Sequence, residues 1–132
     1  MTRRELFKKI NTKCIELNNK YYINRGGCCY VAAVLAELLT KCDISYKVVY
    51  YFDGGCHYYI KVIDRYLNSD YCTKKSGIIR IYDSSYEDIY EKYYNNGWND
   101  EYNIRYNGFV KISLMRIFNK YLNGQRRNNR KT

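Results

Sequence analysis

The segment CCYVAAVLAELLTK, residues 28–41, constrains the fold more than any other part of the sequence. Its run VAAVLAELL would be apolar on nearly every side of a helix, with Glu37 as the only charge. Such a helix is typical of the buried centre of a domain. Gly26 and Gly27 precede it and allow close backbone approach at its first turn. The sequence therefore predicts a central helix around which the other elements must pack.

The remaining segments alternate between helical and strand periodicity. Thr2 and Glu5 have the spacing of a capping box and open a first amphipathic helix. Residues 45–52, 56–63 and 78–82 are rich in β-branched and aromatic residues, and Asp53-Gly54-Gly55 is a hairpin turn. Short helices are expected at 84–94 and 113–122, the second stopped by Gly124, with loops at 64–77 and 95–108. This order predicts an α+β fold, with a three-stranded antiparallel meander packed on the buried helix.

Length and composition limit the class of protein. The chain has 132 residues, 46% hydrophobic and 27% charged, which suits one globular domain. We expect this domain to span residues 1–124, with a basic, disordered tail at 125–132. No apolar run is long enough to span a bilayer, and MTRRELFKKI does not resemble a signal peptide. These features favour a reducing compartment and six free thiols. We expect a bacterial cytoplasmic location, or the host cytoplasm or virion if a phage encodes the protein.

The formal net charge of +10 bears on the partners of the protein. Basic residues concentrate towards both ends of the sequence, including Arg126, Arg127, Arg130 and Lys131 in the tail. Such a field attracts polyanions without sequence preference. The expectation is weak, non-specific contact of the tail with nucleic acid and no membrane partner.

Three residues could form a catalytic group. Cys28 opens the predicted central helix, His57 is the only histidine and opens a strand, and Asp83 ends another strand. A helix N-terminus lowers the pKa of a thiol, and an imidazole can exchange its proton. A carboxylate fixes the imidazole tautomer. Together they predict a nucleophile, a general base and acid, and an orienting group.

These residues also carry a family resemblance. The stretches GGCCYVAAVLAELLTKCDISYKVV, GGCHYYIKVID and IRIYDSS resemble the transglutaminase-like core of the papain-like cysteine protease superfamily. That family has Gly-x-Cys opening a helix, a strand led by His and a strand ending in Asp-Pro-Thr. Gly26-Gly27-Cys28, His57 and Asp83-Ser84-Ser85 stand at these places, and the resemblance covers roughly residues 24–85. Asp43 and the two serines depart from the family pattern.

The resemblance implies a papain-like fold and a cysteine-dependent acyl-transfer enzyme that needs no cofactor or metal. Its substrate would be a protein or peptide, with water or an amine as acceptor. The helix length favours Cys28 as nucleophile, whereas the Arg-Gly-Gly-x-Cys pattern of the related arylamine N-acetyltransferases selects Cys29. Candidate oxyanion donors are the Cys28 backbone amide and the side chains of Asn24 and Tyr22.

Two other hypotheses remain at the level of sequence. Cys28, Cys29, Cys56 and His57 are ligand types that zinc accepts, although no Cys-x-x-Cys pair is present. Alternatively, the chain is a catalytically inactive structural or nucleic-acid-associated protein on the same fold, for example a phage component. Its many aromatic rings and basic ends could then grip a single strand.

Overall fold

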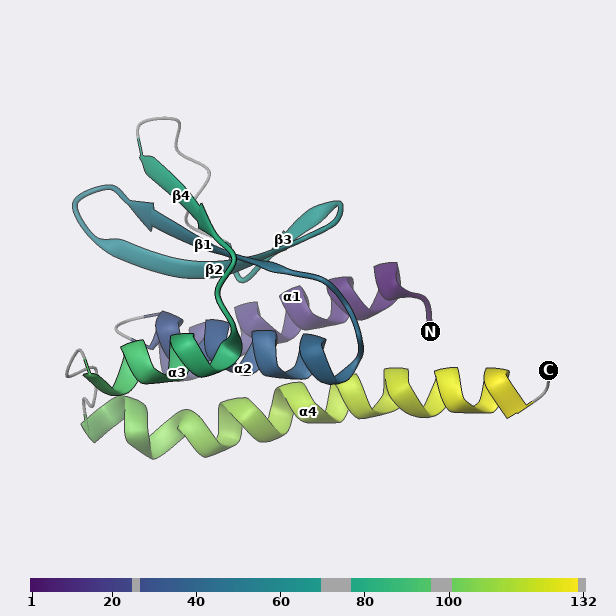
Figure 1. Ribbon diagram of the computed structural model, residues 1–132. Helices are drawn as coiled ribbons and strands as arrows, with labels where there is room; N and C mark the ends of the chain where they lie inside the picture. Colours follow the sequence, from purple (N-terminus) through teal and green to yellow (C-terminus); the bar gives the residue numbers. More distant parts are fainter. Residues whose placement is uncertain (25–26, 70–76, 96–100, 131–132) are drawn as a thin grey trace.

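A computed structural model describes residues 1–24, 27–69, 77–95 and 101–130, without the side chains of 93–95, 101–106 and 128–130. Four helices lie on one side of a four-stranded antiparallel sheet (Figure 1). The helices are α1 (Arg3–Tyr21), α2 (Cys28–Lys41), α3 (Tyr86–Asn95) and α4 (Glu101–Arg130). The strands are β1 (Lys47–Phe52), β2 (Cys56–Val62), β3 (Arg65–Leu67) and β4 (Ile78–Tyr82). This arrangement confirms the predicted α+β class and the small antiparallel sheet.

The central position predicted for α2 is confirmed. Eleven of its residues are buried, and the helix contacts β2, α3 and α4. Tyr58, Ile60 and Val62 of β2 point into the same core, since alternate side chains of a strand share a face. Val49, Tyr51 and Tyr59 form a second, smaller cluster on the opposite face of the sheet. The sheet therefore rests on α2, and β2 is the strand that touches it most directly.

The first helix begins as its sequence predicts. The Thr2 hydroxyl accepts a hydrogen bond of 3.1 Å from the Glu5 backbone amide. A polar side chain at this place satisfies one of the amides that a helix leaves unpaired at its start. Leu6, Ile10 and Cys14 then follow one another along the buried face. Cys14 is thus a small residue of the core.

The topology of the sheet differs from the predicted meander. The strand order is β3-β2-β1-β4, so the strand that ends before Asp83 pairs with β1 and not with β2. The segment predicted as a long loop instead contributes the short strand β3, which forms a hairpin with β2. Because β2 and β4 are both antiparallel to β1, they run in the same direction. The beginning of β2 and the end of β4 therefore lie at opposite ends of the sheet.

The last helix is longer than predicted. α4 begins at Glu101 and continues through Gly124 to Arg130, so the predicted irregular segment and the predicted stop at Gly124 are wrong for these residues. One glycine inside a helix costs only about 1 kcal/mol, which packing can offset. Here Gln125 donates a hydrogen bond of 3.2 Å to the Met1 carbonyl, which fixes this turn of α4 against the start of α1. Residues 131 and 132 of the predicted tail lie outside the described residues.

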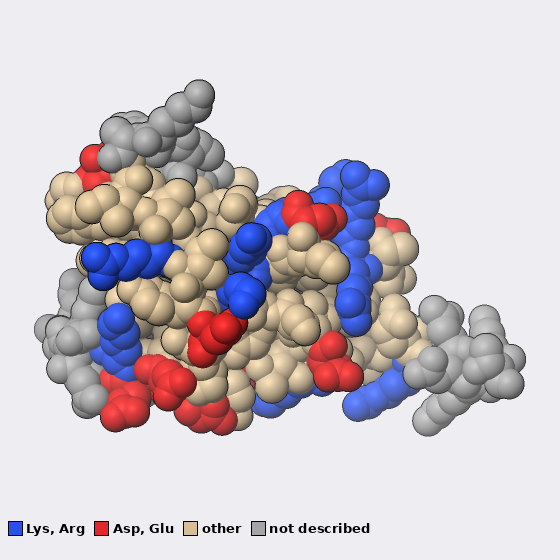
Figure 2. Space-filling view, turned by 45° about the horizontal axis from the view of Figure 1, so that its top comes forward, with Lys and Arg blue, Asp and Glu red and all other residues tan. Residues whose placement is uncertain are grey.

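Within the described residues, no helix combines the length and apolar character needed to cross a bilayer. Lys and Arg side chains, blue in Figure 2, are spread over the visible face and alternate with smaller acidic groups. On this face the basic side chains do not form one patch, so the charge visible there does not by itself identify a binding site.

Candidate active site at the start of the central helix

The Cys28 thiol lies where α2 begins, against the backbone of β2. Its Sγ accepts a hydrogen bond of 3.5 Å from the Tyr58 backbone amide. The amides of Cys28 and Cys29 also act on this sulfur, as expected at a helix N-terminus, where N–H groups have no partner within the helix. Three backbone amides thus favour the thiolate. No side chain caps this helix, whose N-cap residue is Gly27.

Burial outweighs these amides. Only 1% of Cys28 is exposed, and the loss of hydration raises the pKa of its thiol to about 11. The hydrogen bond from Tyr58 lowers the pKa, but by less than burial raises it. A thiol with this pKa is protonated at neutral pH. The resting site therefore holds a neutral thiol rather than a preformed thiolate.

Cys29 points to a different neighbour. Its Sγ lies 3.8 Å from the carbonyl oxygen of Ile89, a residue of α3. Burial and, to a smaller extent, the neighbouring Cys28 raise the pKa of this thiol to about 12. Of the two adjacent cysteines, Cys28 contacts the strand that carries His57 and Cys29 contacts α3. Successive side chains of a helix point in different directions, so the two adjacent thiols have different neighbours.

The imidazole of His57 is held by the end of β3. Its Nε2 lies 2.7 Å from the carbonyl oxygen of Asn68. Because a carbonyl only accepts, Nε2 carries the proton of this bond and Nδ1 keeps the lone pair. Burial lowers the pKa of His57, and the Asn68 carbonyl partly opposes that shift. The ring is therefore neutral at neutral pH, with Nδ1 as its basic atom.

The backbone next to His57 lies beside the Cys28 thiol, but the imidazole lies on the opposite face of the sheet. The amide that donates to Cys28 Sγ belongs to Tyr58 and is bonded to the carbonyl carbon of His57. The His57 ring itself stacks on Tyr59, with centroids 5.8 Å apart. Among the described residues, no hydrogen bond joins the thiol to the imidazole.

Asp83 does not reach this site. His57 is level with Tyr51 and Ile79 across the sheet, whereas Asp83 follows Tyr82, four residues further along β4. That offset is about 13 Å along the strands, in addition to about 10 Å across two strand spacings. The Asp83 carboxylate is exposed and forms an ion pair of 2.6 Å with Lys47. The predicted hydrogen bond from the His57 ring to the Asp83 carboxylate is therefore not made.

Asparagines form a network beside the imidazole that sequence reasoning missed. Asn68 and Asn24 exchange two side-chain hydrogen bonds of 2.9 and 3.1 Å. The Asn11 side chain accepts from the Asn68 amide at 2.9 Å, and Asn18 accepts from the Asn24 amide at 3.0 Å. Asn68 has a φ of 61°, a left-handed conformation that asparagine tolerates better than most residues. One sequence signal could have revealed the hairpin that carries Asn68. Ile63-Asp64 lies between two apolar stretches and can form a two-residue turn.

The remaining predicted residues are placed as follows. Asn24, an oxyanion candidate, has its amide committed to Asn68, whereas Tyr22 is 46% exposed at the left-handed end of α1. Within the described residues, no three His, Cys, Asp or Glu side chains could share a metal ion. Cys56, one ligand of the zinc hypothesis, is exposed at the start of β2. Gly26 lies outside the described residues.

Comparisons with family models, curated proteins and solved structures found no match. The resemblance to the transglutaminase-like core therefore rests on the sequence motifs alone.

Cysteine alkylation should follow the burial of the thiols. At about pH 7.5, iodoacetamide is expected to modify exposed Cys56 well before Cys28 or Cys29, because the thiolate is the reactive form and burial disfavours it. Since the pKa of Cys28 is about 11, its labelling rate should increase with pH throughout the range below that value. Mass spectrometry of peptides locates each modified cysteine. Fast labelling of Cys28 below about pH 7, slowed by His57→Ala, would instead indicate a thiolate–imidazolium pair.

Asn68 is expected to be sensitive to substitution for two separable reasons. Asn68→Ala removes both bonds to Asn24 and leaves at positive φ a residue that tolerates this conformation less well than asparagine, so we expect a loss of about 2–4 kcal/mol in the free energy of unfolding. Asn68→Gly loses the same bonds without the strain and should be less destabilising by about 1 kcal/mol. Urea unfolding measures both variants, with Asn19→Ala on the exposed face of α1 as the control. Equal stability of the Gly and Ala variants would contradict the role of the left-handed backbone.

Proposed function

We propose that the protein is a cysteine-dependent acyl-transfer enzyme, in which Cys28 is the nucleophile and His57 the general base and acid. One observation carries the proposal. The only histidine of the chain precedes the residue whose amide binds Cys28 Sγ at the N-terminus of the central helix. The backbone between His57 and Tyr58 thus lies beside the Cys28 thiol, whereas the imidazole lies on the sheet face that it shares with Tyr59. Both are held by backbone groups rather than by long, mobile side chains.

The proton transfers follow from the tautomer of His57. The proposed reaction requires that substrate binding bring the His57 ring to the α2 side of β2. Nδ1 then takes the proton of the Cys28 thiol, and the sulfur forms a bond to the carbonyl carbon of the substrate. The imidazolium then returns its proton to the leaving amine as the C–N bond breaks, which leaves a thioester on Cys28. Water as acceptor completes a protease or amidase reaction, and a second amine completes a transglutaminase-like reaction. The same imidazole removes the acceptor's proton in that second half.

The Asn68 carbonyl takes the orienting place that the sequence assigned to Asp83. It fixes Nε2–H and so presents Nδ1 as the base. A neutral carbonyl stabilises an imidazolium less than a carboxylate does, since it carries only a partial charge. This agrees with a neutral resting pair, in which proton transfer accompanies attack on the substrate. The three amides around Cys28 then stabilise the charge that develops on sulfur.

The surface near Asn68 offers polar groups to a peptide or amide substrate. The four asparagines of the network line a cavity of about 120 Å³, together with Cys14, Ile15 and Ser69. Carboxamide side chains both donate and accept hydrogen bonds, so they can pair with the N–H and C=O groups of a peptide. The basic character of the chain favours acidic substrates by electrostatic attraction.

An activated ester tests the nucleophile without knowledge of the natural substrate. With p-nitrophenyl acetate, the thiol displaces p-nitrophenol and retains an acetyl group as a thioester. We expect peptide mass spectrometry to locate this acetyl group on Cys28 in the wild type, and to find none at residue 28 in Cys28→Ala. Cys29→Ala is the matched control, because Cys29 contacts α3 rather than β2. Circular dichroism confirms that each variant is folded.

The same experiment distinguishes the inactive alternative. The near-complete burial of Cys28 favours a structural thiol if no substrate opens the site. A structural thiol predicts acetylation of exposed Cys56 and none of Cys28. That outcome, in a folded protein, would overturn the proposed enzyme.

A further inference from the structure

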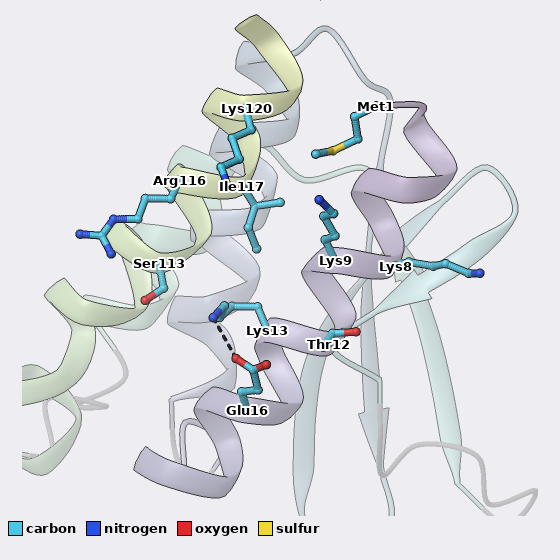
Figure 3. A pocket seen from close by; sticks show the side chains of 10 residues that line it. All are labelled: Met1, Lys8, Lys9, Thr12, Lys13, Glu16, Ser113, Arg116, Ile117 and Lys120. Atoms are coloured by element: carbon cyan, nitrogen blue, oxygen red, sulfur yellow. Dashed lines mark hydrogen bonds and ion pairs between the residues drawn. The ribbon is translucent and has the colours of Figure 1, made fainter. Parts of the chain in front are cut away.

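A second hollow lies far from Cys28, between α1 and α4. Its volume is about 440 Å³, and we name it the basic groove. Five of its ten lining side chains are basic and one is acidic: Lys8, Lys9, Lys13, Arg116, Lys120 and Glu16. Figure 3 shows Lys9, Lys13 and Ile117 between the two helices, with Lys8 and Arg116 pointing away to either side. Both walls of the groove thus contribute positive charge.

Helical spacing aligns these charges along the groove. On α1, Lys9, Lys13 and Lys20 follow at intervals of four and seven residues, so they lie along one stripe. On α4, Arg116, Lys120 and Arg127 follow at the same two intervals. Neighbouring cations four residues apart stand about 6 Å from each other along a helix axis. The groove is therefore bordered by a row of cations on each helix, with Arg116 at its outer edge pointing away from α1.

Most of this charge is not neutralised by the protein. Only Lys13 has an acidic partner, Glu16 at 2.8 Å. Among the described residues, Lys9, Arg116 and Lys120 form no ion pair. Like charges held together repel one another, and a polyanion that replaces their counterions gains free energy by releasing them. The groove is thus built to favour an extended anion.

An aromatic ring continues the α4 row. Phe109 lies seven residues before Arg116, so it occupies the same stripe, and 58% of it is exposed. Its inner side stacks on Tyr21 with the ring planes 14° apart, which fixes its orientation. An exposed ring beside a row of cations is the combination that holds a base and its phosphates in single-strand binding proteins. An acidic peptide would use the cations but has no planar base for Phe109.

We propose that the basic groove binds single-stranded nucleic acid, with the phosphates on the two rows of cations and a base on Phe109. The proposed site lies on α1 and α4 and is not limited to the C-terminal residues. It does not depend on the chemistry of Cys28, and Cys28→Ala should bind the strand like the wild type.

Fluorescence anisotropy with a labelled single strand of about 20 nucleotides tests the proposal. The triple variant Lys9→Gln/Arg116→Gln/Lys120→Gln should bind at least about tenfold more weakly at low salt. The slope of log K against log salt should decrease by about 2, or about 0.7 for each lost phosphate contact. The matched control Lys41→Gln/Lys61→Gln/Arg80→Gln removes the same charge elsewhere and should lose much less affinity.

Phe109→Leu separates base stacking from charge. It keeps an apolar side chain and every cation, and it should weaken single-strand binding about fivefold or more without changing the salt slope. Equal losses in both triple variants would overturn the proposal, because they would mean attraction by net charge alone. Tighter binding of polyglutamate than of the labelled strand would also overturn it, and so would duplex binding that Phe109→Leu does not affect.

Discussion

His57→Gln is expected to slow the acetylation of Cys28 by p-nitrophenyl acetate about 100- to 10,000-fold at about pH 7. The thiol of Cys28 is protonated at this pH, since burial raises its pKa to about 11. Without a neighbouring base, attack depends on the small fraction of thiolate in solution. Glutamine keeps a donor for the Asn68 carbonyl but cannot accept the thiol proton. The rate of p-nitrophenol release measures the loss.

The pH dependence of this rate gives a second signature. The pKa of His57 lies below its ordinary value of 6.5 because the ring is buried. The wild-type rate should therefore reach its plateau below pH 6.5 and decrease at lower pH, where the imidazole is protonated. In His57→Gln no plateau is expected there, and the rate should rise about tenfold per pH unit towards the pKa of Cys28. Parallel profiles for the two proteins would exclude His57 as the base.

Asp83 provides the control for this experiment. Asp83→Asn removes the carboxylate that binds Lys47 at the other end of the sheet. We expect the acetylation rate to stay within about twofold of the wild type, since an exposed ion pair contributes little to the fold. A loss as large as that of His57→Gln would instead place Asp83 in the reaction and contradict the observed strand order.

Ile60→Ala is expected to lower the free energy of unfolding by about 2–5 kcal/mol. The Ile60 side chain is fully buried in β2, inside the core that the strand shares with α2. Alanine would leave a cavity there, because α2 and the sheet are fixed by their other contacts. The total stability of a domain is about 5–15 kcal/mol, so this single change removes a large part of it. Urea unfolding monitored by circular dichroism measures the difference.

The chain contains a matched control for that substitution. Ile63 lies just after β2 and is 92% exposed. Ile63→Ala removes the same atoms without opening a cavity, and it should change stability by less than about 0.5 kcal/mol. Similar losses in both variants would mean that the chemical change and not the packing of β2 determines the effect.

Much of the fold could be predicted from local sequence patterns. The helix at residues 28–41 and the strand at 78–82 match the structure, and the other predicted strands agree with it within a few residues. The helix of residues 3–21 also begins at its predicted cap. These elements are determined by hydrophobic periodicity, capping residues and turn glycines, which act over a few neighbouring positions. The extension of α4 through Gly124 was missed because contacts with the start of α1 stabilise it.

The same distinction between local patterns and long-range contacts applies to the candidate site. Cys28 at a helix start and His57 at a strand start follow from sequence, since each depends on the element that carries it. The hydrogen-bond partners of these two residues do not follow from sequence, because they depend on which strands pair. Asn68 reaches His57 only through the hairpin of β2 and β3. Asp83 is kept away only because β4 pairs with β1.

The sequence by itself determined the buried helix, the three longer strands and the positions of the only histidine and of two adjacent thiols. Tertiary structure alone decided that Cys28 faces β2 and that Cys29 faces α3. It also decided that an asparagine carbonyl, and not a carboxylate, binds the imidazole. The physical reason is the range of the interactions. Periodicity and caps are local, whereas strand order and burial depend on contacts between segments far apart in the chain.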